Sequence, residues 1–452
     1  MREHAGALTG WGRTAPTVAR VVEADPAELP ALLAAVGERG LIARGLGRSY
    51  GDAAQNAGGT VLAPLTGPAR VERDADGAVV DAPAGTSLHD LMRVLVADGL
   101  FVPVTPGTRY VTLGGAVACD IHGKNHHRVG GFGDHVVALD LLGADGVTRR
   151  IGPDTDPRLF WATVGGMGLT GVVTRVVLRL VPIETAYLTV HTERVGDLSA
   201  LMQRMRESDD RHPYSVAWID TMASGRSMGR SVLTQGRHTT LAELEEHGGR
   251  RARRPLVVPA DPRLSVPVPA PSGLISRPTV RAFNELWFRK APRDRPAGIE
   301  SIPAFFHPLD AVADWNRLYG RRGLVQYQLV VPHESEEAMT DLVRMVSDAG
   351  APSFLAVLKR FGPGSPGLLS FPVAGWTLAL DVPTTPRLAA LFARLDHAVR
   401  EAGGRVYLAK DARLSPDTFA AMYPRLEEFR AVRAEVDPRG VFQSDLSRRL
   451  GI

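Results

Sequence analysis

The sequence predicts an α+β protein of two domains, and three observations lead to this prediction. The chain has 452 residues, of which 44% are hydrophobic and 23% charged, and this length suits two or three globular domains. Residues 1–184 alternate helical patterns with short strands bounded by glycines. Residues 325–410 read as strand, helix, strand, strand, helix and strand, which is typical of helices layered on an antiparallel sheet. We therefore expect a first domain over 1–184, completed by a C-terminal segment 405–452, and a second domain over 185–404.

The first domain is expected to begin with a helix and a short strand. PAELPALLAAVGERG (26–40) has apolar residues at helical spacing, and LIARG (41–45) reads as a strand. A second helix is expected over TSLHDLMRVLVADG (86–99). Its first residues, Thr86 or Ser87, can accept hydrogen bonds from the free N–H groups of the first turn.

Glycine-containing turns separate the strands that follow. VVALDLLGADGVTRRI (136–151) is expected to form a β-hairpin that turns at its Asp-Gly pair, and GVVTRVVLRLVP (171–182) a long strand. GGMGLTGVV (165–173) contains G-x-G-x-x-G, which in dinucleotide-binding proteins follows a strand and opens a helix. Here a β-rich segment follows the pattern, so we interpret it as a tight turn into a strand.

The second domain is predicted from six segments with strand or helix periodicity. In order they are VQYQLVVP, EEAMTDLVRMVSDAG, PSFLAVLKRFG, GWTLALDVP, PRLAALFARLDHAVREAGG and RVYLAK. Residues 236–300, before these segments, are rich in proline, arginine and glycine and include RRARR (250–254). We expect long mobile loops there, which serve as a lid or a docking surface.

A helical pattern near the C-terminus is expected to pack back on the first domain. Residues 418–442 place five apolar side chains on one helical face. They are Phe419, Met422, Leu426, Phe429 and Val432.

Composition excludes several kinds of function. A single cysteine excludes internal disulfides, cysteine-ligated iron–sulfur clusters and dithiol redox motifs. The net charge of +4 comes mainly from arginine, since the chain has only four lysines, and no aromatic-and-basic pattern indicates nucleic-acid binding. The N-terminus lacks an apolar core of signal-peptide length, and no apolar run approaches the roughly 20 residues of a membrane span. We therefore expect neither a signal peptide nor a transmembrane segment.

The stretch ACDIHGKNHH (118–127) brings the only cysteine together with three histidines and a lysine. The spacing matches no zinc ligand set such as C-x₂-C or H-x₃-H, so we predict no metal site. On the residues alone, Cys119 is a small buried side chain and His122 a core histidine with satisfied hydrogen bonds.

Three glycine clusters indicate a bound nucleotide. They are ARGLGRSYGDAAQNAGG (43–59), TPGTRYVTLGGAVACDIHGKNHHRVGGFGDH (105–135) and the GGMGLTGVV stretch. Glycine lets the main chain approach a phosphate closely and aim successive N–H groups at it. Clusters of this kind after short strands suggest a nucleotide pyrophosphate.

The first two clusters, followed by GGMGLTGVVTRVVLRL, resemble the FAD-binding domain of the vanillyl-alcohol oxidase/p-cresol methylhydroxylase (VAO/PCMH) superfamily. The resemblance covers nearly the whole chain. Its most specific parts are DIHGKNHH, VQYQLVVP, LSFPVAGWTLALDVP, VYLAKDAR, MYPRLEEF and VDPRGVFQSDLSRRL. It implies the two-domain PCMH-type fold, in which two loops enclose the FAD pyrophosphate and a second α+β domain on an antiparallel sheet binds the substrate.

The resemblance implies FAD as the cofactor, without metal or thiol chemistry. Many relatives attach the flavin through a histidine in the first loop, where this chain has Tyr50, so we expect FAD to be bound non-covalently. The residues implied for FAD are Arg44, Gly45, Gly47, Arg48, Ser49, Tyr50, Gly51, Pro106, Gly107, Thr108, Gly114, Gly115, Cys119, His122, Gly123, Asn125, Gly168, Gly171, Val172, Tyr407 and Lys410.

The resemblance also implies catalytic and substrate-binding residues. A lysine near the flavin stabilises the anion that forms on reduction, and we expect this role for Lys410 at the end of RVYLAK. Further catalytic roles are expected for His122 and Lys359, whereas Lys290, in the loop-rich region, is expected to matter little. The residues implied for the substrate are Tyr50, Trp218, Phe306, Gln326, Gln328, Lys359 and Ala379, the last at a position where relatives carry cysteine.

Within the superfamily, the chain is most similar to enzymes that oxidise the 2′-hydroxyl of decaprenylphosphoryl-β-D-ribose to a 2′-keto intermediate. This is the first half of an epimerisation that makes the arabinose donor for cell-wall arabinan. The resemblance implies a polyprenyl-phosphoryl pentose substrate, an NAD(P)H-dependent short-chain reductase partner, and peripheral contact with the cytoplasmic or periplasmic face of a membrane. Two alternatives stay open: an alditol or aldonolactone oxidase of small soluble polyols, and a non-catalytic lipid-binding relative.

Overall fold

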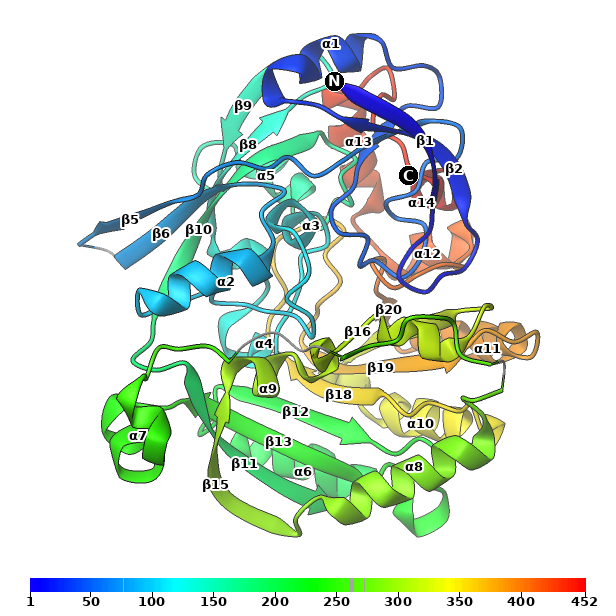
Figure 1. Ribbon diagram of the computed structural model, residues 1–452. Helices are drawn as coiled ribbons and strands as arrows, with labels where there is room; N and C mark the ends of the chain where they lie inside the picture. Colours follow the sequence, from blue (N-terminus) through cyan, green and yellow to red (C-terminus); the bar gives the residue numbers. More distant parts are fainter. Residues whose placement is uncertain (76, 260–263, 272) are drawn as a thin grey trace.

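The computed structural model describes residues 1–75, 77–259, 264–271 and 273–452. Two sheets are built from residues before 183, and an eight-stranded sheet built from later residues lies below them in Figure 1. The α+β fold of two domains that the sequence predicts is confirmed. Within the described ranges, no helix is both long enough and apolar enough to cross a membrane.

The first domain contains a mixed sheet and an antiparallel sheet. The strand orders are β1-β2-β4-β3 and β5-β6-β10-β8-β9, and β7 also pairs with β10. The strands are β1 (Arg2–Leu8), β2 (Thr17–Glu23), β3 (Leu41–Ala43), β4 (Thr60–Leu62), β5 (Arg70–Asp74), β6 (Gly77–Pro83), β7 (Leu100–Phe101), β8 (Val136–Leu142), β9 (Thr148–Ile151) and β10 (Val172–Pro182). The helices are α1 (Leu29–Ala34), α2 (Leu88–Ala97), α3 (Leu113–Ala118), α4 (His126–Val129) and α5 (Pro157–Thr163).

Local signals in the sequence account for several of these elements. The Ser87 side chain accepts a hydrogen bond from the main-chain N–H of Asp90, so Ser87, rather than Thr86, caps α2. The hairpin of β8 and β9 is confirmed, and Gly146 in its turn has a φ of 78°, which favours glycine. The GMGLTG pattern leads directly into β10, as expected for a turn before a strand.

The predicted helix over 26–40 is shorter in the structure. A 3₁₀ turn at Pro26–Glu28 precedes α1, which ends at Ala34. The sequence after α1 contains Gly40 with a φ of 66°, and this left-handed conformation is incompatible with a continuing right-handed helix.

The second domain is an eight-stranded antiparallel sheet with the strand order β15-β11-β13-β12-β18-β19-β17-β20. The strands are β11 (Tyr187–Val195), β12 (Tyr214–Ile219), β13 (Ser231–His238), β15 (Asp294–Ser301), β17 (Leu324–Pro332), β18 (Ala356–Phe361), β19 (Gly375–Pro383) and β20 (Arg405–Val406). The principal helices are α6 (Leu198–Ser208), α10 (Glu337–Ala349) and α11 (Leu388–Glu401). The predicted order of strands and helices over 325–410 is confirmed.

The prediction of long loops over 236–300 is wrong. The segment contains α7 (Leu241–His247), the exposed helix α8 (Arg277–Lys290) and β15, besides the short strand β14 (Leu264–Ser265), which pairs with β16 (Val312–Ala313). RRARR lies in and just after a 3₁₀ turn, Gly249–Arg253. Residues 260–263 and 272 of the segment lie outside the described residues. The high content of proline and arginine led to the wrong prediction of loops. Pro278 stands in the first turn of α8, where proline is tolerated, so it does not prevent this helix.

The C-terminal segment differs from its prediction at two places. RVYLAK is a strand only over Arg405–Val406, and Lys410 lies in the turn that follows, with its N–H bonded to the Tyr407 carbonyl. Because β20 joins the eight-stranded sheet, the chain leaves the second domain after residue 406. The apolar face over 418–442 belongs to two helices, α12 (Pro416–Met422) and α13 (Leu426–Val436), which Pro424 separates. All five predicted side chains are buried, and α13 packs on α5 of the first domain.

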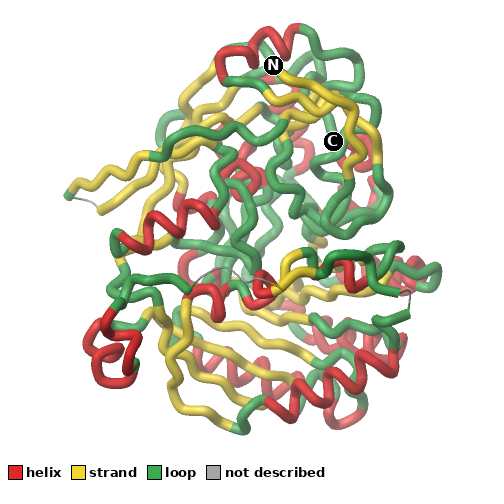
Figure 2. The backbone as a smooth tube through the Cα atoms, in the orientation of Figure 1, coloured by secondary structure: helices red, strands yellow, loops and turns green. Residues whose placement is uncertain are grey.

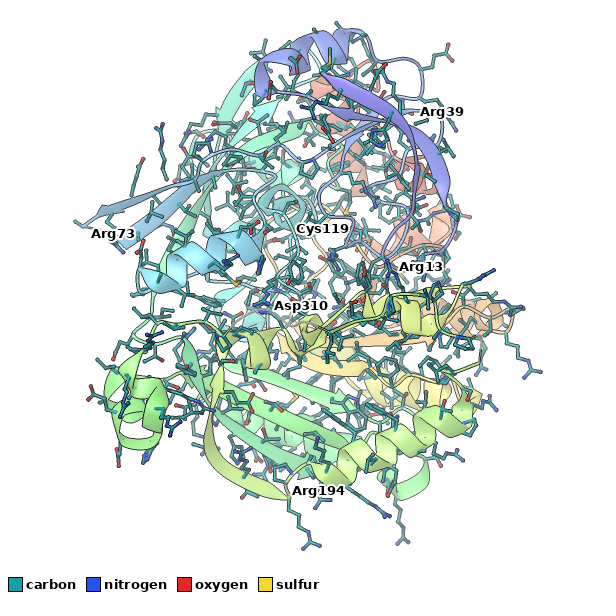
Figure 3. All side chains as sticks on the ribbon, viewed as in Figure 1. Arg13, Arg39, Arg73, Cys119, Arg194 and Asp310 are labelled. Carbon is teal, nitrogen blue, oxygen red and sulfur yellow. The ribbon has the colours of Figure 1, made fainter. Side chains whose placement is uncertain are left out.

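Loops fill the space between the domains. Figure 2 shows mainly loop segments between the upper sheets and the eight-stranded sheet. In Figure 3, Cys119 and Asp310 lie at this level. Asp310 accepts a hydrogen bond from the main-chain N–H of Arg109 at 2.9 Å, so it ties the second domain to the loop at 105–109.

Candidate active site

A cavity of about 800 Å³ lies between the two domains. The first domain contributes the glycine-rich loops at 43–50, 105–108 and 167–173, together with α3. The second domain contributes residues of β12, β17, β18 and β19. This volume is at the upper end of the range for small-molecule and cofactor sites, so the cavity can hold a large cofactor or a smaller one with its substrate.

The first loop presents unpaired main-chain donors. Among the described residues, the main-chain N–H groups from Gly45 to Ser49 have no hydrogen-bond acceptor. Arg44 holds the loop, because its guanidinium donates to the carbonyls of Ala54 at 2.9 Å and Thr9 at 2.7 Å. Successive free N–H groups at a cavity wall form an anion-binding site, and this fits a pyrophosphate.

The second loop is equally open to the cavity. A side chain at Gly107 would meet no atom within 4 Å, so the main chain there faces free space. The hydroxyl of Thr112 caps α3 by accepting from the N–H of Gly115. The Tyr407 hydroxyl donates to the carbonyl of Cys119 at 2.8 Å, which fixes the end of α3 against the segment that follows β20. These loops therefore leave room where a bulky ligand can contact the main chain, and both fit FAD.

Nearly all the residues that the sequence predicts for the cofactor line this cavity. Gly51 and Asn125 do not. A Cβ at Gly51 would lie 1.9 Å from the Asp411 carbonyl oxygen, so glycine is needed there for packing. The Asn125 side chain is buried and donates to the Pro103 carbonyl at 2.9 Å. Both residues support the loops from behind.

A buried polar cluster lies where α3 and its following loop meet the eight-stranded sheet. His122 Nε2 is 2.9 Å from the Gln328 side-chain nitrogen, and His122 Nδ1 is 3.0 Å from Lys359 Nζ. The imidazole also contacts the rings of Phe361 and Tyr407. Burial, followed by the charge of Lys359, lowers the pKa of His122 well below its ordinary value, so His122 is neutral.

Three of the four lysines, Lys124, Lys359 and Lys410, are half-buried at the cavity. Burial lowers the pKa of Lys359 to about 7 and that of Lys124 to about 8, and the neighbouring lysines add to the effect on Lys359. The pKa of Lys410 is also lowered by burial, but the Asp381 carboxylate opposes this effect. Crowded amino groups with lowered pKa values are typical of functional sites.

Sequence reasoning missed Lys124 and Asp381. Lys124 Nζ donates to the carbonyl of Phe305 and lies 4.3 Å from that ring's centroid. Asp381 is fully buried at the end of β19 and accepts a hydrogen bond from Gln326. The scarcity of lysine could have singled out Lys124, and the aspartate inside the apolar strand GWTLALDVP could have singled out Asp381.

The remaining predicted residues form the apolar walls. Trp218, Phe306 and Ala379 line the cavity, and the Trp218 ring is held by its N–H donating to the Phe354 carbonyl at 2.9 Å. Cys119 is half-buried rather than buried and also faces the cavity; burial raises the pKa of its thiol to about 11. In the described part of the chain, no group of histidine, cysteine, aspartate or glutamate side chains could hold a metal ion.

Lys290 lies at the site, although it was expected to matter little. It ends α8 at the rim of the cavity, beside Trp287, and both residues line the opening.

Comparison with known proteins gives matches over both domains. Residues 18–152 match the FAD binding domain model, and residues 379–450 match the model of D-arabinono-1,4-lactone oxidase. The chain is 44% identical to decaprenylphosphoryl-β-D-ribose oxidase of Mycolicibacterium smegmatis, over 98% of this chain and 97% of that protein. It is 43% identical to an uncharacterised protein of Streptomyces coelicolor over 81% of this chain and 100% of that protein. An alditol oxidase of Streptomyces is 26% identical over 98% of this chain and 99% of that protein.

Proposed function

This chain belongs to the VAO/PCMH family of FAD-dependent oxidoreductases, and from that premise we propose that it oxidises the 2′-hydroxyl of a polyprenyl-phosphoryl β-D-ribose to the 2′-keto compound. The similarity to decaprenylphosphoryl-β-D-ribose oxidase over nearly the full length of both chains supports this substrate. The observation that carries the proposal is the cavity, which joins the free N–H groups of the FAD loop to the cluster of His122, Lys359 and Lys410.

Each group of residues has a part in this reaction. FAD, when bound, would accept the hydrogen and the electron pair of the C–H bond that is oxidised, while the hydroxyl proton leaves to a base. Lys410 supplies positive charge for the anionic reduced flavin, because a buried ammonium interacts more strongly than one in water. Gln326 and Gln328 offer hydrogen bonds to sugar hydroxyls, and Trp218 and Phe306 enclose the sugar in apolar surface that excludes water.

The finer parts of this function follow from the substrate. A keto sugar becomes an epimer only when a second enzyme reduces it from the opposite face, so we expect the short-chain reductase partner and a place in arabinan and cell-wall synthesis. A polyprenyl chain resides in a membrane, so we expect peripheral membrane contact. The apolar face of α8 (Phe283, Leu286 and Trp287) supports this contact, since Leu286 is 69% exposed and Trp287 reaches the cavity rim.

Anaerobic addition of a polyprenyl-phosphoryl ribose to the purified enzyme tests the proposal. We expect complete bleaching of the oxidised flavin by the lipid and little bleaching by xylitol. Bleaching by xylitol alone would favour the alditol-type alternative. The match of residues 379–450 to the lactone-oxidase model and the similarity to an alditol oxidase support this alternative. A purified protein without yellow colour would favour the non-catalytic alternative.

A further inference from the structure

Thr377 on β19 begins a chain of hydrogen bonds that runs through Gln328 and His122 to Lys359. All three of Thr377, Gln328 and His122 are buried. The Thr377 hydroxyl donates to the Leu329 carbonyl at 2.8 Å, and its single hydrogen is committed there. The Thr377 oxygen can therefore only accept from the Gln328 amide group, 3.3 Å away. This contact fixes the Gln328 amide with its nitrogen toward Thr377.

The orientation of Gln328 determines which nitrogen of His122 carries the proton. The same Gln328 nitrogen lies 2.9 Å from His122 Nε2, and it can only donate. Nε2 must then carry a lone pair. Because burial keeps the imidazole neutral, its proton resides on Nδ1.

The tautomer of His122 in turn determines the protonation state of Lys359. His122 Nδ1–H points to Lys359 Nζ at 3.0 Å, so the lysine nitrogen must accept a hydrogen bond. An ammonium has no lone pair and cannot accept, whereas a neutral amine can. The lowered pKa of Lys359 also favours the neutral amine.

We propose that Thr377 is a positioning residue which, through Gln328 and His122, holds Lys359 as a neutral amine and turns the Gln328 amide oxygen toward the substrate. That oxygen has no hydrogen-bond partner among the described residues, and Gln328 lines the cavity. The site thus offers an acceptor to a substrate hydroxyl. Because Lys359 is neutral, it does not repel the positive charge of Lys410.

The groups around this chain come from several elements. Lys124, His126 and Cys119 lie in or beside α3 and α4, Lys410 follows β20, and Asp381 lies on β19. The charges of Lys124 and Lys410 oppose a third ammonium at Lys359, and so they reinforce the effect of the hydrogen-bond chain.

Nitrogen-15 NMR of histidine-labelled holoenzyme tests the inference without substrate. We expect the His122 signals, identified by their loss in His122→Gln, to show Nδ1 protonated and Nε2 unprotonated at and above neutral pH. Protonation of Nε2 in the wild-type enzyme would overturn the proposal. This readout is independent of the substrate, so it stands apart from the test of the proposed function.

Two variants test the role of Thr377, and this part rests on the proposed function. Thr377→Val has nearly the same shape but no hydroxyl, so Gln328 can turn and the His122 proton can move to Nε2. Thr377→Ser keeps the hydroxyl and should restore the wild-type tautomer. We expect Thr377→Val to retain FAD and to raise KM for the lipid about tenfold through the loss of one oriented acceptor. An unchanged tautomer in FAD-loaded Thr377→Val would overturn the role of Thr377.

Discussion

The ammonium nitrogen of Lys410 lies 4.2 Å from the centroid of the Tyr50 ring. The two residues come from opposite ends of the chain, and the main-chain N–H of Tyr50 bonds to the Ala409 carbonyl at 2.9 Å. The first FAD loop and the turn after β20 therefore hold each other in place, and both line the cavity. This contact connects the cofactor end of the site to the cation that we assign to catalysis.

Replacing Lys410 with methionine should slow flavin reduction and leave FAD bound. Methionine keeps much of the apolar stem but removes the charge that stabilises the reduced flavin. Loss of one preorganised donor typically costs about 10² to 10³ in rate, or roughly 3 to 4 kcal/mol. Anaerobic single-turnover bleaching of the flavin, with FAD content measured in parallel, checks this outcome.

Lys290 cannot serve as the control for that variant, because it lies at the rim of the cavity. Arg344→Met on α10 is a suitable substitute, since Arg344 is exposed and pairs with Asp341 at the protein surface. Bleaching at the wild-type rate in Lys410→Met would remove Lys410 from the mechanism. Loss of FAD would instead identify it as a cofactor-binding residue.

Denaturation should release all the flavin from the polypeptide. The first loop has Tyr50 where many relatives carry the histidine that forms a covalent bond, and a phenol makes no histidyl linkage. After precipitation with acid, we expect the yellow colour in the supernatant and an unmodified mass for the chain. Flavin that stays with the pellet would contradict this reading of the loop.

The parts of the structure that the sequence predicts well depend on local signals. The cap at Ser87, the Asp-Gly turn before β9 and the order of elements after residue 325 each follow from neighbouring residues. The helix α8 was missed because its polar and exposed apolar residues lack a buried stripe, and of its 14 residues only Val280 and Asn284 are buried. Residues such as Thr377 act through contacts with a neighbouring strand, β17, which the order of residues along the chain does not reveal.

The Cys119 thiol should react slowly with alkylating agents at neutral pH. Burial raises the pKa of the thiol from its ordinary value near 9 to about 11, so the thiolate fraction at pH 8 falls roughly a hundredfold. We expect the rate of modification by iodoacetamide, followed by mass spectrometry, to rise with pH toward about 11. If the thiol were only sterically shielded, the rate would be lower, but the pH of the half-maximal rate would stay at the ordinary value. The denatured chain gives the reference rate. Rapid alkylation of the native enzyme at pH 7 would refute the prediction.

Contact with a membrane should depend on the apolar face of α8 and on RRARR. Leu286→Glu places a charge on the exposed face, and removal of a leucine from an apolar environment costs about 1.5 to 3 kcal/mol. Replacing Arg250, Arg251, Arg253 and Arg254 with glutamine removes about 1 kcal/mol each near an anionic surface. Both changes should weaken sedimentation with anionic vesicles.

Neutral vesicles separate the two effects. Leu286→Glu should weaken sedimentation with vesicles of either kind, whereas the arginine replacements should matter only where the lipid is anionic. Wild-type sedimentation by the arginine variant would show that RRARR is a solvated charge run. Wild-type sedimentation by both variants would place the membrane contact elsewhere.

Asp381 should set the pH range over which Lys410 is charged. The carboxylate raises the pKa of Lys410, in opposition to burial, and the pKa of Asp381 is itself raised by burial. Lys410 is cationic below its pKa, so flavin reduction that needs the cation falls as the pH rises through that value.

Asp381→Asn keeps an oxygen that can accept from Gln326 but removes the negative charge, and the pKa of Lys410 should then be lower. We expect the alkaline decline of the reduction rate to begin at lower pH in Asp381→Asn, whereas Asp341→Asn on the exposed side of α10 leaves it in place. The other groups near Lys410 include Tyr50, Cys119, His122 and Lys359, and they are the same in all three enzymes. An alkaline decline that stays in place or moves to higher pH in Asp381→Asn would show that this carboxylate does not sustain the charge of Lys410.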